Sequence, residues 1–184
     1  MAPDPRLIEL FSYYREGEMH GAGLLLRLIK MMEDDGDAQI KLTLHMAEEA
    51  NHAWLWTKRI ADLGGTPVQV STGYQTRIGR RTIPRGVIDL LALTIIVEER
   101  SVARYKEHAS RKDVDPETKE VLDKVTGDEV WHMSWIRGKL DEIAAAQNKT
   151  DYAAEMVEKY REVDREVYGE LRAMEIAAYG GTPP

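Results

Sequence analysis

The chain has 184 residues, a length that suits one domain with a sizeable hydrophobic core, and a formal net charge of −7, which argues against nucleic acid as its ligand. It contains no cysteine, which excludes disulfides, iron–sulfur clusters and thiol catalysis. The first residues lack the basic and apolar blocks of a signal peptide, and no uncharged apolar run approaches the ~20 residues needed to cross a bilayer. We therefore expect a cytoplasmic protein without a membrane segment.

Apolar residues recur at helical spacing almost throughout the chain, and no clear strand pattern is visible, which predicts an all-α fold. Asp4 and Pro5 form a helix N-cap with proline at the first helical position, and they open a helix that we expect to end near Met32. A second helix is expected from about Asp37 to a Gly-Gly-Thr-Pro stop. Residues 64–83 have no sustained helical period and are predicted to be a long connection.

Two more helices are predicted at about 84–111 and 116–145, the second preceded by the same cap-and-proline pattern. Two short helix–helix links on either side of one long link suit a four-helix bundle with a single crossover, formed by residues 5–145. A fifth helix is expected at 150–179 as an addition to that bundle. The whole chain is then a single domain, residues 1–184.

The seam that faces inward in helix bundles alternates spacings of three and four residues, and on each of the first four helices it carries one glutamate. Two of these helices add a histidine three residues later, on the same helix face. The inward polar residues are Glu18, Glu49, His52, Glu98, Glu129 and His132. Burying an acid is unfavourable unless it is paired or bound to a metal, so four such acids together indicate a site.

An internal repeat with an offset of 80 residues relates the two halves of the chain. It connects the inward residues in three pairs, which are Glu18 and Glu98, Glu49 and Glu129, and His52 and His132. The repeat also selects Glu98 over its neighbour Glu99, because only Glu98 falls on the offset and on the seam that contains Tyr105. We therefore expect two similar helical hairpins related by an approximate two-fold axis.

One glutamate on each of two helices, plus Glu-x-x-His on each of the other two, is the ligand set of ferritin-like di-iron and di-manganese carboxylate proteins. The chain resembles that superfamily over residues 5–145, and "GEMHGA" and "EEANHAW" are most similar to its rubrerythrin-like and bacterial ferritin-like members. The resemblance implies that the six inward residues bind two metal ions, with Glu49 and Glu129 bridging them. The rubredoxin cysteines are missing, however, and the Glu-x-x-Glu of rubrerythrins reads Glu98-x-x-Ser101, which argues against a peroxide reductase.

Four ionised carboxylates around two divalent ions sum to zero charge, which suits a buried site; without metal they would repel one another, and some would take up protons. The mixture of oxygen and nitrogen ligands suits two iron ions, two manganese ions or a mixed pair, and zinc would also bind. The resemblance implies activation of dioxygen or peroxide by an oxidase, oxygenase or ferroxidase, with a small-molecule substrate and an electron donor as further partners. The alternatives are an iron-storage cage subunit and a metal-free helical interaction protein.

Several other residues near this site allow two interpretations. Glu48 and Asp128 either accept the free imidazole N–H of a ligand histidine or lie on a solvated face. Tyr14 and Tyr105 could hydrogen-bond a ligand or donate an electron, although core packing is the simpler interpretation. His45, one turn before a predicted ligand, is either a further ligand or proton carrier or a core residue.

His20 and His108 are expected to be structural or exposed, and the four tryptophans are expected in the core. The basic run Arg77–Arg85 is interpreted as a solvated loop. The fifth helix carries a continuous apolar stripe from Tyr152 to Ala178, which must be covered by its own bundle or by a second subunit. We favour a homodimer in which this helix takes part.

Overall fold

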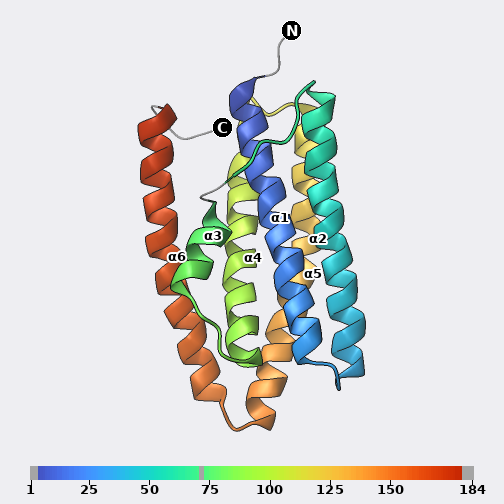
Figure 1. Cartoon of the computed structure of the whole chain (residues 1–184), viewed down its shortest axis with the longest axis vertical. Helices are drawn as coiled ribbons and strands as arrows, with labels where there is room; N and C mark the ends of the chain where they lie inside the picture. The colour runs from blue at the N-terminus through green and yellow to red at the C-terminus, as the bar shows by residue number, and fades with distance from the viewer. Residues whose placement is uncertain (1–3, 71–72, 180–184) are drawn as a thin grey trace.

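The computed structural model describes residues 4–70 and 73–179, with side chains as far as residue 174. Within these ranges the chain forms six helices and no strand, which confirms the predicted all-α class (Figure 1). The helices are α1 (Pro5–Met31), α2 (Gly36–Asp62), α3 (Tyr74–Arg81), α4 (Val87–Ala109), α5 (Pro116–Ala146) and α6 (Thr150–Tyr179). None of them is both long enough and apolar enough to span a membrane.

Aspartate caps fix the starts of three long helices. Asp4 accepts the backbone N–H of the second helical residue of α1, and Asp35 and Asp115 each accept an N–H three residues ahead, at α2 and α5. Asp35 and Asp115 are related by the 80-residue offset, so the two halves begin their second helix in the same way. Each cap stabilises its helix by about 1 kcal/mol because it satisfies an N–H that has no partner within the helix.

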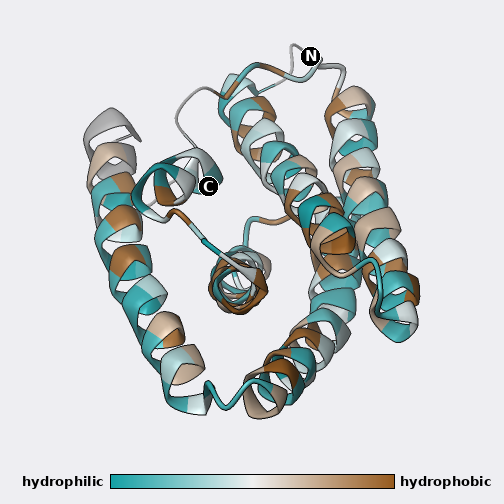
Figure 2. Ribbon diagram, turned by 60° about the horizontal axis from the view of Figure 1, so that its bottom comes forward, coloured by the Kyte–Doolittle hydropathy of each residue, from teal (hydrophilic) through white to brown (hydrophobic). Residues whose placement is uncertain are grey.

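The long helices pack as two hairpins, α1 with α2 and α4 with α5, and the hairpins meet through α1–α4 and α2–α5 contacts (Figure 1). α4 also packs against α6, and every residue from Ile88 to Glu98 is buried. Figure 2 shows α4 between the other helices. A helix buried on all sides needs mostly apolar residues, and eight of the eleven residues in this segment are apolar, the exceptions being Asp89, Thr94 and Glu98.

The predicted connection at 64–83 is wrong in its second half, where α3 forms a short helix that packs against α6 and α1. α3 buries only Tyr74 and Ile78, one turn apart, so its apolar pattern is too short to give a helical period. It is held by contacts far away in sequence: the Tyr74 hydroxyl donates to Asp164 at 2.9 Å. The basic run is therefore part helix, and Arg81 makes a bidentate pair with Glu170 of α6 rather than lying in a bare loop.

α6 lies along its own chain and buries the middle of its apolar stripe, whereas Tyr152 and Met174 near the two ends are exposed, and the side chain of Ala178 lies outside the described residues. Ala153, Met156, Tyr160, Val167 and Leu171 are buried against the core that α4 dominates. The buried part of the stripe is thus covered by the bundle of the same chain and not by a second subunit. The homodimer remains a prediction, but the stripe no longer supports it.

Candidate metal centre

All six inward residues predicted from the repeat lie together between α1, α2, α4 and α5, and none exposes more than 4% of its surface. We call them the central cluster; its members are Glu18, Glu49, His52, Glu98, Glu129 and His132. The register on α4 is as the repeat indicates. Glu98 is buried, whereas Glu99 is half-buried and forms ion pairs with Arg137 and Arg161.

One half of the cluster consists of Glu18, Glu49, His52 and Glu129, whose ligand atoms all lie within 4.8 Å of one another. His52 Nδ1 points at the carboxylates, 3.4 Å from Glu129 Oε1 and 3.6 Å from Glu18 Oε2. This is an arrangement of three carboxylate oxygens around one imidazole nitrogen, and it could hold a metal ion.

The other half consists of His45, Glu49, Glu129 and His132, again with all ligand atoms within 4.8 Å. His132 Nδ1 is 2.8 Å from Glu129 Oε2 and 3.6 Å from Glu49 Oε1. Glu98 adjoins this half, since its Oε1 is 3.5 Å from His45 Nε2. Glu49 and Glu129 belong to both halves, which are therefore contiguous and could each hold an ion.

Two outer carboxylates fix the orientation of the cluster histidines. Asp128 of α5 lies 3.0 Å from Nε2 of His52 on α2, and Glu48 of α2 lies 2.7 Å from Nε2 of His132 on α5. Each carboxylate thus serves the histidine of the opposite helix and not the one that follows it in sequence. Each carboxylate can accept an Nε2–H from its histidine, and in a neutral imidazole this leaves Nδ1 as the inward lone pair, which is the form that binds a metal.

The four acids cannot all be ionised at little cost without a cation. Burial raises the pKa of Glu49 well above its usual value, and the neighbouring carboxylates, Glu98 first, raise it further. Burial and the Glu129 charge likewise raise the pKa of Glu98. Burial acts in the same direction on Glu129, but the contacts of its oxygens with His132 and His52 outweigh it and lower its pKa. The metal-free cluster therefore retains protons on some carboxyls and a charge on Glu129.

The histidines respond in opposite directions. Burial by itself lowers the pKa of His52, yet its contacts with Glu129 and Glu18 dominate and raise the pKa to about 10. His45 has no such compensation: burial, followed by repulsion from His132, lowers its pKa to about 3. His45 is therefore a neutral imidazole in the centre of the bundle.

Unsatisfied polar atoms gather at this one place. In the described part of the chain, six buried side-chain nitrogen or oxygen atoms have no hydrogen bond, and five belong to the cluster or to His45. They are Nδ1 and Nε2 of His45, Oε1 of Glu49, Nδ1 of His52 and Oε1 of Glu129. Leaving such an atom without a partner costs about 1–3 kcal/mol. A metal ion would satisfy several of them at once.

Tyr105 reaches the cluster, whereas Tyr14 does not. The Tyr105 hydroxyl donates a hydrogen bond to Glu18 Oε1, and burial together with the Glu18 charge raises the pKa of this tyrosine. Tyr14 packs edge-on against Tyr105, with ring centroids 5.0 Å apart, and its hydroxyl is 3.2 Å from His108 Nδ1. Tyr105 therefore orients a predicted ligand, and Tyr14 and His108 are core residues.

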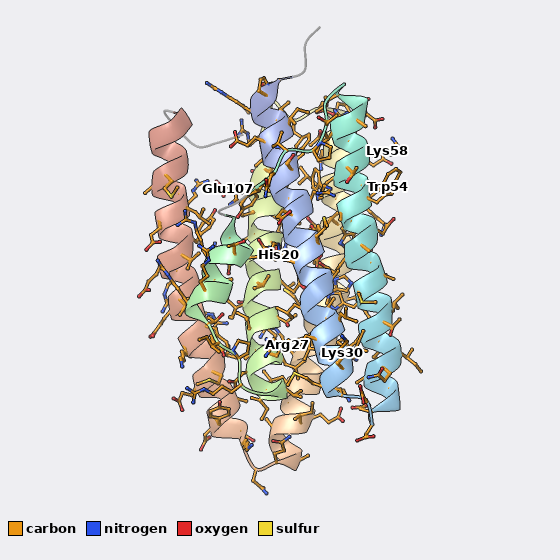
Figure 3. All side chains as sticks on the ribbon, in the orientation of Figure 1. His20, Arg27, Lys30, Trp54, Lys58 and Glu107 are labelled. Atoms are coloured by element: carbon orange, nitrogen blue, oxygen red, sulfur yellow. The ribbon has the colours of Figure 1, made fainter. Side chains whose placement is uncertain are left out.

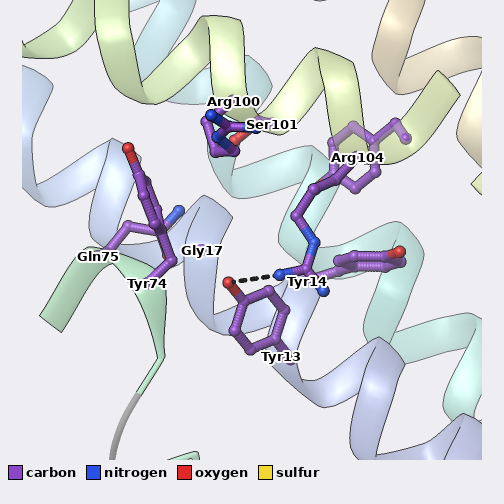
Figure 4. A pocket seen from close by; sticks show the side chains of 9 residues that line it. Tyr13, Tyr14, Gly17, Tyr74, Gln75, Arg100, Ser101 and Arg104 are labelled. Atoms are coloured by element: carbon purple, nitrogen blue, oxygen red, sulfur yellow. Dashed lines mark hydrogen bonds between the residues drawn. The ribbon is translucent and has the colours of Figure 1, made fainter. Parts of the chain in front are cut away.

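A pocket lies between α1, α3 and α4 (Figure 4), and its lining includes Tyr105, whose hydroxyl contacts Glu18 of the cluster. Its wall carries four tyrosines and two arginines, and Arg104 donates to the Tyr13 hydroxyl at 3.0 Å. Tyr74 and Gln75 close it from the α3 side. Sequence reasoning missed this pocket because one of its walls belongs to the helix that periodicity did not predict.

The exposed residues correct one expectation. Trp56 is fully buried near the cluster, but Trp54 is 58% exposed and projects outward from α2, and Trp131 is 38% exposed (Figure 3). A core position for all four tryptophans is therefore wrong. Each helical residue is rotated by about 100° from the one before it, so Trp54 and Trp56, two positions apart, point to nearly opposite sides of α2 and cannot both face inward. His20, as expected, is exposed on α1.

Gly21 gives the Glu49 side chain the space that it occupies, and we expect Gly21→Ala to weaken metal binding. A Cβ added at Gly21 would collide with Glu49 Oε2, an atom of a predicted ligand, and the Glu49 carboxylate would have to shift away from its present position in the cluster. The matched control is Gly23→Ala on the same helix, where an added Cβ meets nothing within 4 Å. Alanine should there raise stability by roughly 0.5–1 kcal/mol and leave metal content unchanged. Metal analysis with thermal denaturation separates the two variants; equal metal content in both would contradict the role of Gly21.

Comparison with known proteins finds no family model and no curated protein that matches this chain. The function is therefore argued from the geometry and chemistry of the site.

Proposed function

We propose that this chain is a ferritin-like carboxylate protein that binds two iron ions, or manganese or a mixed pair in their place, and activates dioxygen or peroxide. One observation carries the proposal: two groups of buried ligand atoms share Glu49 and Glu129. Shared carboxylates are what two ions at the usual separation of ~3.5–4 Å require.

The helix arrangement supports the same proposal. Two hairpins joined by the long segment between α2 and α4 suit a ferritin-like bundle with one crossover, to which α6 is an addition. The repeat is also reflected in space, because the equivalent residues Glu18 and Glu98 flank the shared pair from α1 and α4. A metal-free interaction protein would have no reason to retain four acids and five unsatisfied polar atoms in its core.

Bound iron would supply electrons for oxygen chemistry, and the residues of the chain provide the surroundings that this chemistry needs. Glu18, Glu49, His52, Glu98, Glu129 and His132 would hold the ions. Asp128 and Glu48 fix the two histidine rings, and the Tyr105 hydroxyl fixes Glu18. Trp56, one turn after His52 on α2, and Phe11, which packs against it with ring centroids 5.3 Å apart, are fully buried and would help to exclude bulk water.

The proposal is tested by loading metal-free protein with ferrous iron under anaerobic conditions. We expect about two ions per chain, and rapid consumption of dioxygen when air is admitted or of peroxide when peroxide is added. A stoichiometry near zero would overturn the proposal. Light scattering on the same sample distinguishes the storage alternative, because a closed cage of many subunits would favour storage, whereas a monomer or dimer favours an oxidase or oxygenase.

A further inference from the structure

Among the histidines and carboxylates of the site, His45 is the one without a counterpart in the repeat. Subtracting or adding 80 relates every other ligand to an identical residue, but His45 corresponds to Val125. Both positions lie one turn before a shared glutamate, on α2 and α5, and both are fully buried. At this position the approximate two-fold symmetry is therefore broken, by an imidazole on one side and an isopropyl group on the other.

The His45 ring is placed so that one nitrogen points into the cluster. Nε2 lies 3.4 Å from Glu49 Oε1 and 3.5 Å from Glu98 Oε1, the distances expected between neighbouring ligands of one ion rather than between hydrogen-bonded atoms. The ring stacks on His132, with centroids 3.5 Å apart, and Trp131 lies edge-on at 6.4 Å. These contacts fix the plane of the ring, and neither ring nitrogen has a hydrogen-bond partner.

From this geometry we infer that His45 is a seventh ligand and binds, through Nε2, only the ion that Glu98 and His132 hold. This inference rests on the proposed two-metal function. The first ion then has one imidazole, from His52, and the second has two, from His132 and His45. The two ions are chemically inequivalent although the repeat makes the remaining ligands equivalent.

Cobalt(II) is a suitable probe, because it accepts the same ligands and its unpaired electrons shift the proton signals of bound imidazoles. Each coordinated ring keeps one N–H, which exchanges in heavy water. We expect three exchangeable shifted signals in the loaded wild-type protein, one each from His45, His52 and His132. Two signals in the wild-type protein would overturn the inference while leaving two-metal binding intact, and failure to bind cobalt would instead refute the proposed function.

The variant His45→Val copies the residue at the equivalent position of the other half. It should show two signals, and cobalt titration should show one of the two sites weakened by roughly 10–100-fold or more while the other is unchanged. The matched control is His108→Val, which also removes a buried imidazole but lies outside the cluster, next to Tyr14; it should retain three signals. Equal affinities in His45→Val and wild type would contradict a ligand role.

Should His45→Val change the fold, the signal count of the wild-type protein still decides the question. We expect no such change. Removing a buried imidazole with two unsatisfied nitrogens should raise the stability of the metal-free protein. A lower melting temperature of the metal-free variant would indicate that His45 has a packing role instead.

Discussion

Glu129→Ala is expected to remove most of the bound metal, from about two ions per chain to well below one, because this carboxylate belongs to both halves of the cluster. Its oxygens lie 2.8 Å from His132 Nδ1 and 3.4 Å from His52 Nδ1, so the change removes a ligand from each ion. Metal analysis after iron reconstitution and dialysis measures the loss. Loss of only one ion would show that Glu129 does not bridge.

Glu99→Ala is the control for this experiment, since Glu99 adjoins a predicted ligand but faces the other way. Its carboxylate pairs with Arg137 and Arg161 at the partly exposed side of α4. Losing such pairs costs about 0–1 kcal/mol and should not affect metal content. If Glu99→Ala emptied the site and Glu98→Ala did not, the register assigned to α4 would be wrong.

The five long helices could be predicted from sequence because their signals are local. Aspartate caps, prolines at first helical positions and apolar repeats lie within a few residues of the boundaries they determine. The start of α4 shows the limit: Pro84 was the predicted opening, but the helix begins at Val87, and the Asp89 side chain accepts the N–H of Arg85 ahead of it. Local side-chain contacts of this kind shift the first residue of a helix without changing the helical spacing of its apolar residues.

α3 could not be predicted because contacts between distant segments stabilise it. Tyr74 bonds to Asp164, which also pairs with Arg100 of α4 at 2.6 Å, so a single buried carboxylate joins three helices. Asp164 is 90 residues from Tyr74 and 64 residues from Arg100 along the chain, so no local pattern brings these partners together. For the same reason, the sequence could not show what covers α6, because its apolar stripe requires an apolar partner but does not specify which one.

The central cluster could be predicted because a repeat and a seam, both visible in sequence, agree on Glu98. The outer carboxylates show what sequence leaves open. Their spacing leaves a role as histidine partners and a solvated face equally open, and the crossing of Asp128 to His52 and of Glu48 to His132 depends on how α2 and α5 are staggered. In the same way, the seam places His45 inward, and only the packed structure brings its Nε2 among the carboxylates.

The pH dependence of the metal-free protein follows from three groups of the cluster. Glu49 and Glu98 have raised pKa values, so the folded state keeps protons that the unfolded chain releases above its usual carboxyl pKa of 4.5. His52 has a pKa of about 10 against an ordinary value of 6.5. All three contribute stability that is present at low pH and lost as pH rises. The pKa values of His45 and Glu129 are lowered, so the stability that these two groups contribute to the folded state is lost only as pH falls below 6.5 and 4.5, respectively.

We therefore expect the metal-free protein to lose stability steadily between about pH 6.5 and pH 9, and the loaded protein to resist this loss. Metal ions replace the protons of Glu49 and Glu98, so binding releases protons and strengthens as pH rises. At metal concentrations about 100 times the dissociation constant the stabilisation is about 2.7 kcal/mol.

Urea denaturation at pH 6.5, 7.5 and 9, with iron or manganese and with chelator, measures both curves. Glu49→Gln/Glu129→Gln is the control, since it keeps the side-chain shapes while removing two of the charges that hold the ions, and added metal should hardly change its stability. Curves that coincide with and without metal at pH 9 would contradict a buried site of four carboxylates.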